Sequence, residues 1–206
     1  MNARRVALSS MSLTLLAFVI AWRVWSAPSP FAFDGIVRDE KTLQPLEGVF
    51  IIVQWENSGG GLVDARTTCA DLYVTQTDAH GRYHVPTYWP AISPFVDRYI
   101  RVYKIGYESA IPTRPMSVSD YEQFVRDWPM REFTGTGDER LGQYNFSGYL
   151  TMCGRNKVET YRRLLPLERA INQEAKTLKV NPDNERSLMG HIGYLQAFEK
   201  ELAKIE

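Results

Sequence analysis

The alternation of apolar and polar residues changes character twice along this chain. Between residues 31 and 107, short stretches with a period of two are separated by turns rich in glycine and proline. Such a pattern is typical of a β-sandwich. The expected strands are residues 31–39, 49–55, 69–77, 82–86 and 97–107. The stretch 49–55 is nearly all apolar, which predicts a strand at the centre of the sandwich.

The next segment, residues 111–154, has no sustained period. Its many aromatic residues are atypical of a disordered chain, so we expect an ordered extension packed on the sandwich. One short helix is predicted within it, over residues 119–127.

From residue 155 onward the pattern becomes helical, with apolar residues three or four positions apart. Pro166 is expected to kink the first helix or to restart it, and residues 180–184 form a turn before the last helix. We therefore predict a helical hairpin. Its last helix carries an apolar stripe that either covers its own domain or faces a protein partner. The stripe consists of Leu188, Ile192, Leu195, Phe198 and Leu202.

The N-terminus predicts export. The basic residues Arg4 and Arg5 precede an uncharged, largely apolar run over residues 6–22, as in a secretory signal. Cleavage after Ser26 gives a periplasmic or extracellular protein. The alternative is an uncleaved anchor in the inner membrane over residues 6–25. The predicted organisation is thus a signal or anchor (1–26), a β-sandwich (31–110), an aromatic-rich extension (111–154) and a helical hairpin (155–206).

The chain has two cysteines, Cys69 and Cys153. An even number of cysteines in an oxidising compartment favours a disulfide. The alternative is a pair of free, buried thiols.

Charge argues against nucleic acid as a partner. The 24 basic and 24 acidic side chains give a formal net charge of zero, and no basic stripe of the kind that nucleic acid requires is present. The membrane is expected to be reached through the N-terminal segment alone.

The segment "TQTDAHGRYHVP" (75–86) holds two of the three histidines, four residues apart. That spacing brings ligands together on a helix, but not across a turn that leads into a strand. Asp78 suits the first position of a type I turn and Gly81 its left-handed position. We therefore expect a turn with His80 at its tip and His84 facing solvent, and no metal site.

Three motifs in this order resemble the carboxypeptidase regulatory-like domain of the prealbumin-like group: "GIVRDEKTLQPLEGVFIIVQW", "TQTDAHGRYHVP" and "VYKIGYES". The resemblance covers about residues 31–110 and implies a mainly β fold, a Greek-key sandwich of seven strands that serves as an accessory or binding module on exported proteins. The residues that match are Gly35, Val37, Asp39, Thr42, Pro45, Leu46, Gly48, Val49, Thr77, Asp78, Gly81, Tyr83, Val85, Pro86, Lys104, Gly106 and Tyr107.

The matched positions are turn and core residues, so the resemblance implies no catalytic residue. No glutamate stands three positions after any histidine, as a zinc carboxypeptidase requires, and the chain ends "AKIE" where hydroxyisourate hydrolases end in Tyr-Arg-Gly-Ser. A nucleophile elbow and a phosphate-binding glycine loop are also missing. We expect no enzyme activity and no cofactor; a hydrolase with an unrecognised carboxylate site is the alternative.

Two binding functions remain. The first is a scaffold or interaction module of the cell envelope that engages another protein. The second is a glycan-binding module in which sugar faces stack on exposed aromatic rings. The aromatic residues considered for it are Tyr88, Trp89, Tyr99 and Tyr103.

Overall fold

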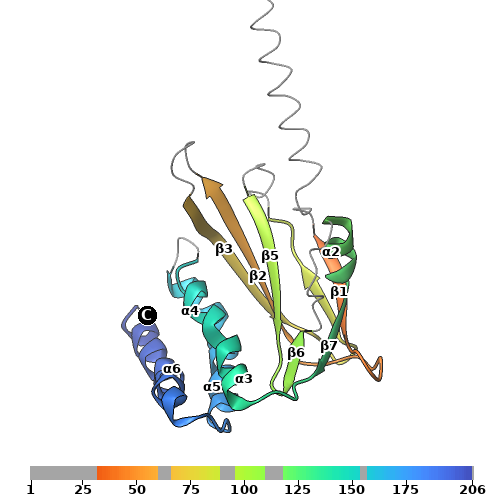
Figure 1. The fold of residues 1–206 in the computed structure, drawn as a ribbon. Helices are drawn as coiled ribbons and strands as arrows, with labels where there is room; N and C mark the ends of the chain where they lie inside the picture. The colour runs from red at the N-terminus through yellow and green to blue at the C-terminus, as the bar shows by residue number, and fades with distance from the viewer. Residues whose placement is uncertain (1–31, 60–65, 89–95, 110–117, 154–156, 206) are drawn as a thin grey trace, which may run out of the picture.

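Two β-sheets and a layer of helices are stacked side by side (Figure 1). The computed structural model describes residues 32–59, 66–88, 96–109, 118–153 and 157–205. The predicted export segment lies outside these residues, as does Trp89. Among the helices that are described, none is both long and apolar enough to cross a bilayer.

The first sheet has the strand order β4-β1-β7-β6. Strand β1 (Phe33–Asp39) runs antiparallel to β4 (Arg82–Val85) and parallel to β7 (Asp127–Glu132). Strand β6 (Tyr107–Ser109) pairs antiparallel with β7. Segments about ninety residues apart in the sequence, β1 and β7, therefore lie side by side at the centre of this sheet.

The second sheet has the order β3-β2-β5 and is antiparallel throughout. Its strands are β2 (Phe50–Gly59), β3 (Arg66–Gln76) and β5 (Val96–Tyr103). The register between β2 and β3 shifts between Trp55 and Glu56, as at a β-bulge.

The core between the sheets comes from alternate residues of the facing strands. Ile51 and Val53 of β2 meet Val37 of β1 and Trp128 and Met130 of β7, all of them almost fully buried. Each such side chain contributes roughly 1.5–3 kcal/mol on burial. The short helix α2 (Val118–Phe124) adds Tyr121 and Phe124 to the margin of this core.

A second core lies on the other face of the second sheet, under the helices. It joins Phe50 and Ile52 of β2 and Leu72 of β3 to Leu164 and Ile171 of helix α5 (Lys157–Ala175). Strand β2 is thus buried on both faces, which explains why residues 49–55 are nearly all apolar. The helical layer consists of α3 (Gly137–Gly142), η2 (Gln143–Asn145), α4 (Phe146–Leu150), α5 (Lys157–Ala175), η3 (Pro182–Asn184) and α6 (Glu185–Ile205).

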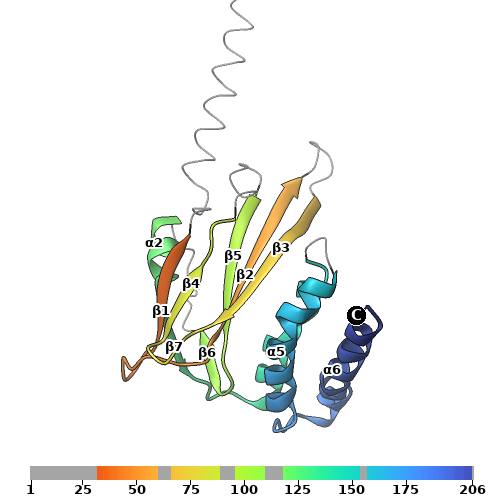
Figure 2. The same cartoon turned by 180° about the vertical axis from the view of Figure 1, so that it is seen from behind.

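Figure 2 shows α5 and α6 side by side as the predicted hairpin, with α5 next to β3. Pro166, expected to kink or restart the first helix, does not restart it, because α5 runs through this residue as one helix. The short helix expected over residues 119–127 is present as α2, but it ends at Phe124. Helices hold more of the described residues than strands do, so "mainly β" understates the helical layer.

The predicted sandwich boundary at residue 110 is too early. Residues 127–132, placed in the extension, form the strand β7 inside the first sheet. Pro129 concealed this strand, because proline is depleted from the interior of sheets. The inward-facing Trp128 and Met130 nevertheless show the alternation of a strand with one buried face.

The segment around His80 is a turn, as predicted. Asp78 accepts hydrogen bonds from the backbone N–H groups of His80 and Arg82, both at 2.8 Å. Gly81 has φ +69°, in the left-handed region, and an added Cβ would lie 3.0 Å from Pro45 and 3.1 Å from the Leu46 nitrogen. His84 is exposed and pairs with Asp34 across the strands at 2.9 Å.

Candidate binding cleft

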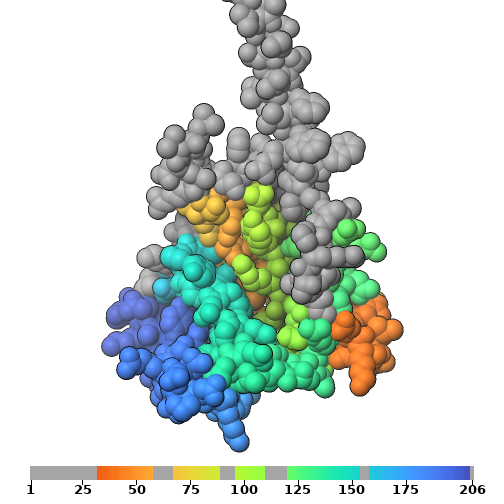
Figure 3. All heavy atoms as spheres, in the orientation of Figure 1, coloured from red at the N-terminus to blue at the C-terminus, as the bar shows by residue number. Residues whose placement is uncertain are grey.

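The helical layer covers only one end of the second sheet. The outward-facing Phe50 and Tyr103 at that end are buried, whereas Tyr99, four residues before Tyr103 on the same face, is 45% exposed. Figure 3 shows α4 and its neighbours bordering β5 and the exposed part of β2 and β3. The uncovered part of the sheet therefore meets the end of the helical layer at α4.

A disulfide between Cys69 of β3 and Cys153, just after α4, fixes this junction. The pairing that compartment and cysteine count predicted is present, and it is compatible with export. Because the two Cα atoms lie 4.7 Å apart, the segment after α4 is held directly against the edge of the sheet.

Between α4 and the sheet lies a cleft of about 400 Å³, within the size range of small-molecule sites. Strands β2, β3 and β5 supply its floor, and α4 with the residues after it supplies one wall. The lining residues are Gln54, Glu56, Thr67, Thr68, Cys69, Arg101, Phe146, Tyr149 and Met152.

The floor carries a chain of polar side chains. Arg101 donates a hydrogen bond from Nη1 to the Gln54 side-chain oxygen at 2.7 Å, and Gln54 donates from Nε2 to Glu56 at 2.6 Å. Gln54 is only 5% exposed, so its amide is held by both neighbours. A cation, an amide and an anion thus stand in line along the floor.

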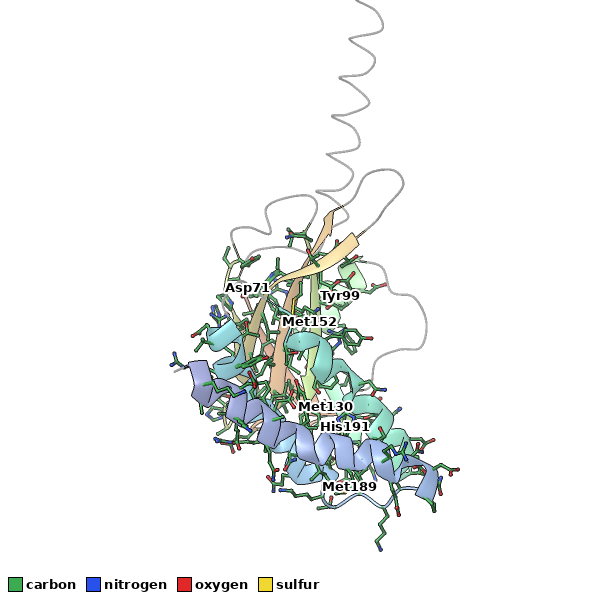
Figure 4. The ribbon with its side chains drawn as sticks, turned by 90° about the vertical axis from the view of Figure 1, so that its left-hand side faces the viewer. Asp71, Tyr99, Met130, Met152, Met189 and His191 are labelled. Atoms are coloured by element: carbon green, nitrogen blue, oxygen red, sulfur yellow. A yellow bond between two sulfur atoms is a disulfide. The ribbon has the colours of Figure 1, made fainter. Side chains whose placement is uncertain are left out.

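The wall is aromatic and apolar. Phe146 packs partly into the second core, which anchors α4, while Tyr149 is 67% and Met152 69% exposed. Large side chains this exposed are informative when they gather at a cleft with convergent polar groups. In Figure 4, Met152 and Tyr99 both lie above α6, over the part of the sheet that the helices leave uncovered.

Of the four aromatic residues considered as ligand contacts, the three that the structure describes do not form one surface. Tyr103 is buried, and its hydroxyl donates to Glu174 at 2.8 Å. Tyr88 stacks on Trp55 with ring centroids 4.5 Å apart, at the margin of the core between the sheets. Tyr99 lies on the opposite, outer face beside the cleft, and Trp89 falls outside the described residues.

The apolar stripe considered as a partner face on the last helix is largely covered by its own domain, which corrects that interpretation. Phe198 and Leu202 are buried, and the ring of Phe198 lies 4.6 Å from that of Tyr161 on α5. Leu188 and Ile192 pack against the same core, and Leu195 is half-buried. An amphipathic helix buries its apolar stripe on the nearest apolar surface, which here is α5 of the same chain.

A buried polar network ties the helical layer to the turn between β5 and β6. Glu174 of α5 accepts hydrogen bonds from Arg140 at 2.8 Å, Tyr144 at 2.9 Å and the Gly106 N–H at 2.7 Å. Burial acts to raise the pKa of Glu174, but the hydrogen bonds from Arg140, Gly106 and Tyr103 outweigh it and leave the pKa below its usual value. Because Arg140 and Glu174 bond to each other and to several further groups, we interpret this network as structural.

Glu168 of α5 is a second buried carboxyl, 3% exposed, between α4 and α6. Burial raises its pKa to about 7, although a hydrogen bond with Ser147 acts in the opposite direction. Its Oε1 has no hydrogen-bond partner within the described part of the chain. It lies under the helices and does not line the cleft.

Sequence reasoning missed most of the cleft. Tyr149 and Met152 carried no periodic signal, and the disulfide was predicted without the surface that it shapes. One signal was available: Gln54 is the only polar residue in the apolar run 49–55. A buried amide in such a strand requires partners on its own face, and Arg101 and Glu56 supply them.

The chain matches no protein-family model, no curated protein and no solved structure. Over the residues that the structure describes, no group of three or more His, Cys, Asp and Glu side chains is placed to hold a metal ion. The function is therefore argued from the geometry of the cleft.

Proposed function

We propose that this chain is an exported, non-enzymatic binding module of the cell envelope, and that it engages another macromolecule through the cleft beside α4. The observation that carries the proposal is that one wall of the cleft is both fixed in place and exposed to solvent. The disulfide holds the end of α4 on β3, and Tyr149 and Met152 project from the same segment with most of their surface in solvent.

The proposed fold family is the prealbumin-like group, with a Greek-key sandwich. Support comes from the matched motif residues, which hold turns and close contacts. Thr77 donates from its hydroxyl to the Leu46 carbonyl at 2.6 Å and accepts from the Val49 N–H at 2.9 Å. Asp39 accepts hydrogen bonds from the Thr42 N–H at 2.7 Å and from the Thr42 hydroxyl at 2.9 Å. These roles explain the motifs without any catalytic function.

Of the two alternatives for the stripe of α6, a protein partner or its own domain, the packing against α5 supports the second. The cleft takes the place of the stripe as the binding surface. The hydrolase alternative has one supporting observation: Glu56 lines the cleft, and its cross-strand partner in β5 is another acid, Asp97. Paired carboxylates are the machinery of many glycoside hydrolases, so every binding experiment should also check that the ligand is recovered intact.

Site-specific photocrosslinking in the producing cells tests the proposal. A benzophenone amino acid replaces Met152 at the rim of the cleft, and in a matched control replaces Leu43, which is also exposed but lies on the turn after β1. We expect one discrete adduct from position 152 that is missing from position 43. The same adducts from both positions, or none from position 152, would contradict the cleft as the binding surface.

A further inference from the structure

The cleft has the chemistry of a carbohydrate site, and we propose that it binds a short, neutral, gluco-configured oligosaccharide. This inference rests on the proposed function and names the ligand of the same cleft. The first argument is charge. The two ionic groups of the floor, Arg101 and Glu56, have opposite signs and are linked through Gln54. A strongly charged ligand would be attracted by one of these groups and repelled by the other, whereas a neutral ligand would meet no such repulsion.

The second argument is hydrogen bonding. Sugar hydroxyls both donate and accept, and adjacent hydroxyls on one ring require donors and acceptors placed close together. The floor offers donors on Arg101 and acceptors on Glu56, with the hydroxyls of Thr67 and Thr68 along β3. Within the described residues, Arg101 and Glu56 each make their side-chain hydrogen bonds to Gln54 alone, which leaves further donors and acceptors for a ligand.

The third argument is the wall. When the hydroxyls of a sugar ring are equatorial, as in glucose and N-acetylglucosamine, both faces of the ring present C–H groups. Such a face packs well on an aromatic ring, which is large, flat and pre-organised. Tyr149 supplies an exposed ring, and the thioether of Met152 beside it is a polarisable, adaptable contact. A volume of about 400 Å³ suits roughly two sugar rings.

The same features disfavour a protein segment in the cleft. An added peptide strand would pair with the outer edge of β3 or β5, whereas the cleft lies over the face of the sheet, around β2, whose backbone is already paired on both sides. An apolar anchor side chain would remove water from Gln54, Glu56 and Arg101. It would offer these polar groups no hydrogen bonds in place of those that they make to water, which is costly. A saccharide covers them and bonds to them at the same time.

Calorimetric titration of the purified chain tests the proposal with three trisaccharide probes. Chitotriose and cellotriose are neutral and gluco-configured, and trigalacturonate is the acidic comparison. We expect chitotriose or cellotriose to bind with a dissociation constant between about 1 µM and about 1 mM, and trigalacturonate to bind at least about tenfold more weakly. Mass spectrometry of the mixture should recover the probe intact.

The variants separate stacking from loss of fold. Tyr149→Ala should weaken binding about tenfold or more, whereas Tyr149→Phe, which keeps the ring, should bind within about threefold of the original chain. Met189→Ala, an equally exposed residue on α6 away from the cleft, should bind as the original does. Far-ultraviolet circular dichroism verifies that each variant is folded.

The outcomes distinguish failure of the saccharide inference from failure of the proposed binding function. If neither neutral probe binds at about 10 mM while crosslinking from position 152 yields a protein adduct, the saccharide inference is wrong and the binding module stands. If no probe binds and position 152 gives no adduct, both fail. Binding that Tyr149→Ala leaves unchanged would place the saccharide elsewhere and overturn the inference.

Discussion

Cys69 on β3 is bonded to Cys153 at the end of the segment that forms the wall of the cleft. The bond joins the floor of the cleft to its wall across 84 residues of sequence. It is therefore both a constraint on the unfolded chain and a support for the wall, and these two roles have separate measurable consequences.

Removing this disulfide should lower stability. Replacing both cysteines by serine frees a closed loop of 84 residues, for which the chain-entropy model gives a loss of about 4.5 kcal/mol. Urea-induced unfolding of the double variant and of the oxidised original measures the difference. A change below about 1 kcal/mol would show that the bond is not formed or constrains little.

The buried carboxyl of Glu168 predicts a pH dependence of stability. Its pKa in the folded chain is about 7, above the ordinary value of 4.5, so the folded state holds the proton more tightly than the unfolded state does. Its contribution is complete below about pH 4.5 and is lost as pH rises through 7, by about 3 kcal/mol in total. Ser147 on α4 and Tyr194 on α6 are the polar groups coupled to it.

The variant Glu168→Gln isolates this effect. We expect its unfolding free energy to lose the part of the pH dependence that falls between about pH 4.5 and about pH 7, and to exceed that of the original chain at the alkaline end. Glu185→Gln, at the exposed start of α6, is the control and should retain the original profile. Parallel profiles for all three proteins would refute the assignment.

The ion pair between Arg140 and Glu174 predicts strong non-additivity. Glu174→Gln leaves the buried guanidinium without its anion and should cost about 3–5 kcal/mol. Adding Arg140→Met should recover part of that loss, because no unpaired charge then remains. The exposed pair of Arg169 and Glu199 is the comparison, where Glu199→Gln should cost less than about 1 kcal/mol. A double-mutant cycle with no coupling would contradict the structural role of the network.

Gly35 tests the role of the family-like motif. It faces Tyr83 across β1 and β4, and an added Cβ would lie 2.6 Å from Cε1 of that buried ring. Gly35→Ala should therefore destabilise the chain by about 1–3 kcal/mol. The matched control is Gly193→Ala in α6, where a Cβ meets nothing within 4 Å and helix propensity favours alanine. Equal melting temperatures for the two variants would contradict a close approach of the Gly35 backbone to the ring of Tyr83.

Local patterns predicted the elements that have strong periodicity or clear turn chemistry. The strand at residues 49–55, the turn at Asp78 and Gly81, and the two long helices all follow from residues close in sequence. The strand β7 was missed because Pro129 masks its alternation. Its place beside β1 depends on long-range packing of Trp128 and Met130, which no local pattern records.

The cleft was harder to predict for the same reason. Its floor comes from three strands and its wall from a five-residue helix, and only the disulfide hinted that β3 and the segment after α4 meet. Exposure could not be judged from sequence either. Tyr99 and Tyr103 lie on one face of one strand, yet Tyr103 is buried under α5 while Tyr99 reaches solvent.

The most direct test of the cleft is an NMR titration of the nitrogen-15-labelled chain with chitotriose. The side-chain amide of Gln54 and the Nε–H of Arg101 report the floor, and the backbone amides of Tyr149 and Met152 report the wall. We predict that these signals shift together and saturably, while those of the Asp78 turn and α6 stay in place. Shifts confined to other parts of the chain, or none at saturating chitotriose, would contradict a carbohydrate site in this cleft.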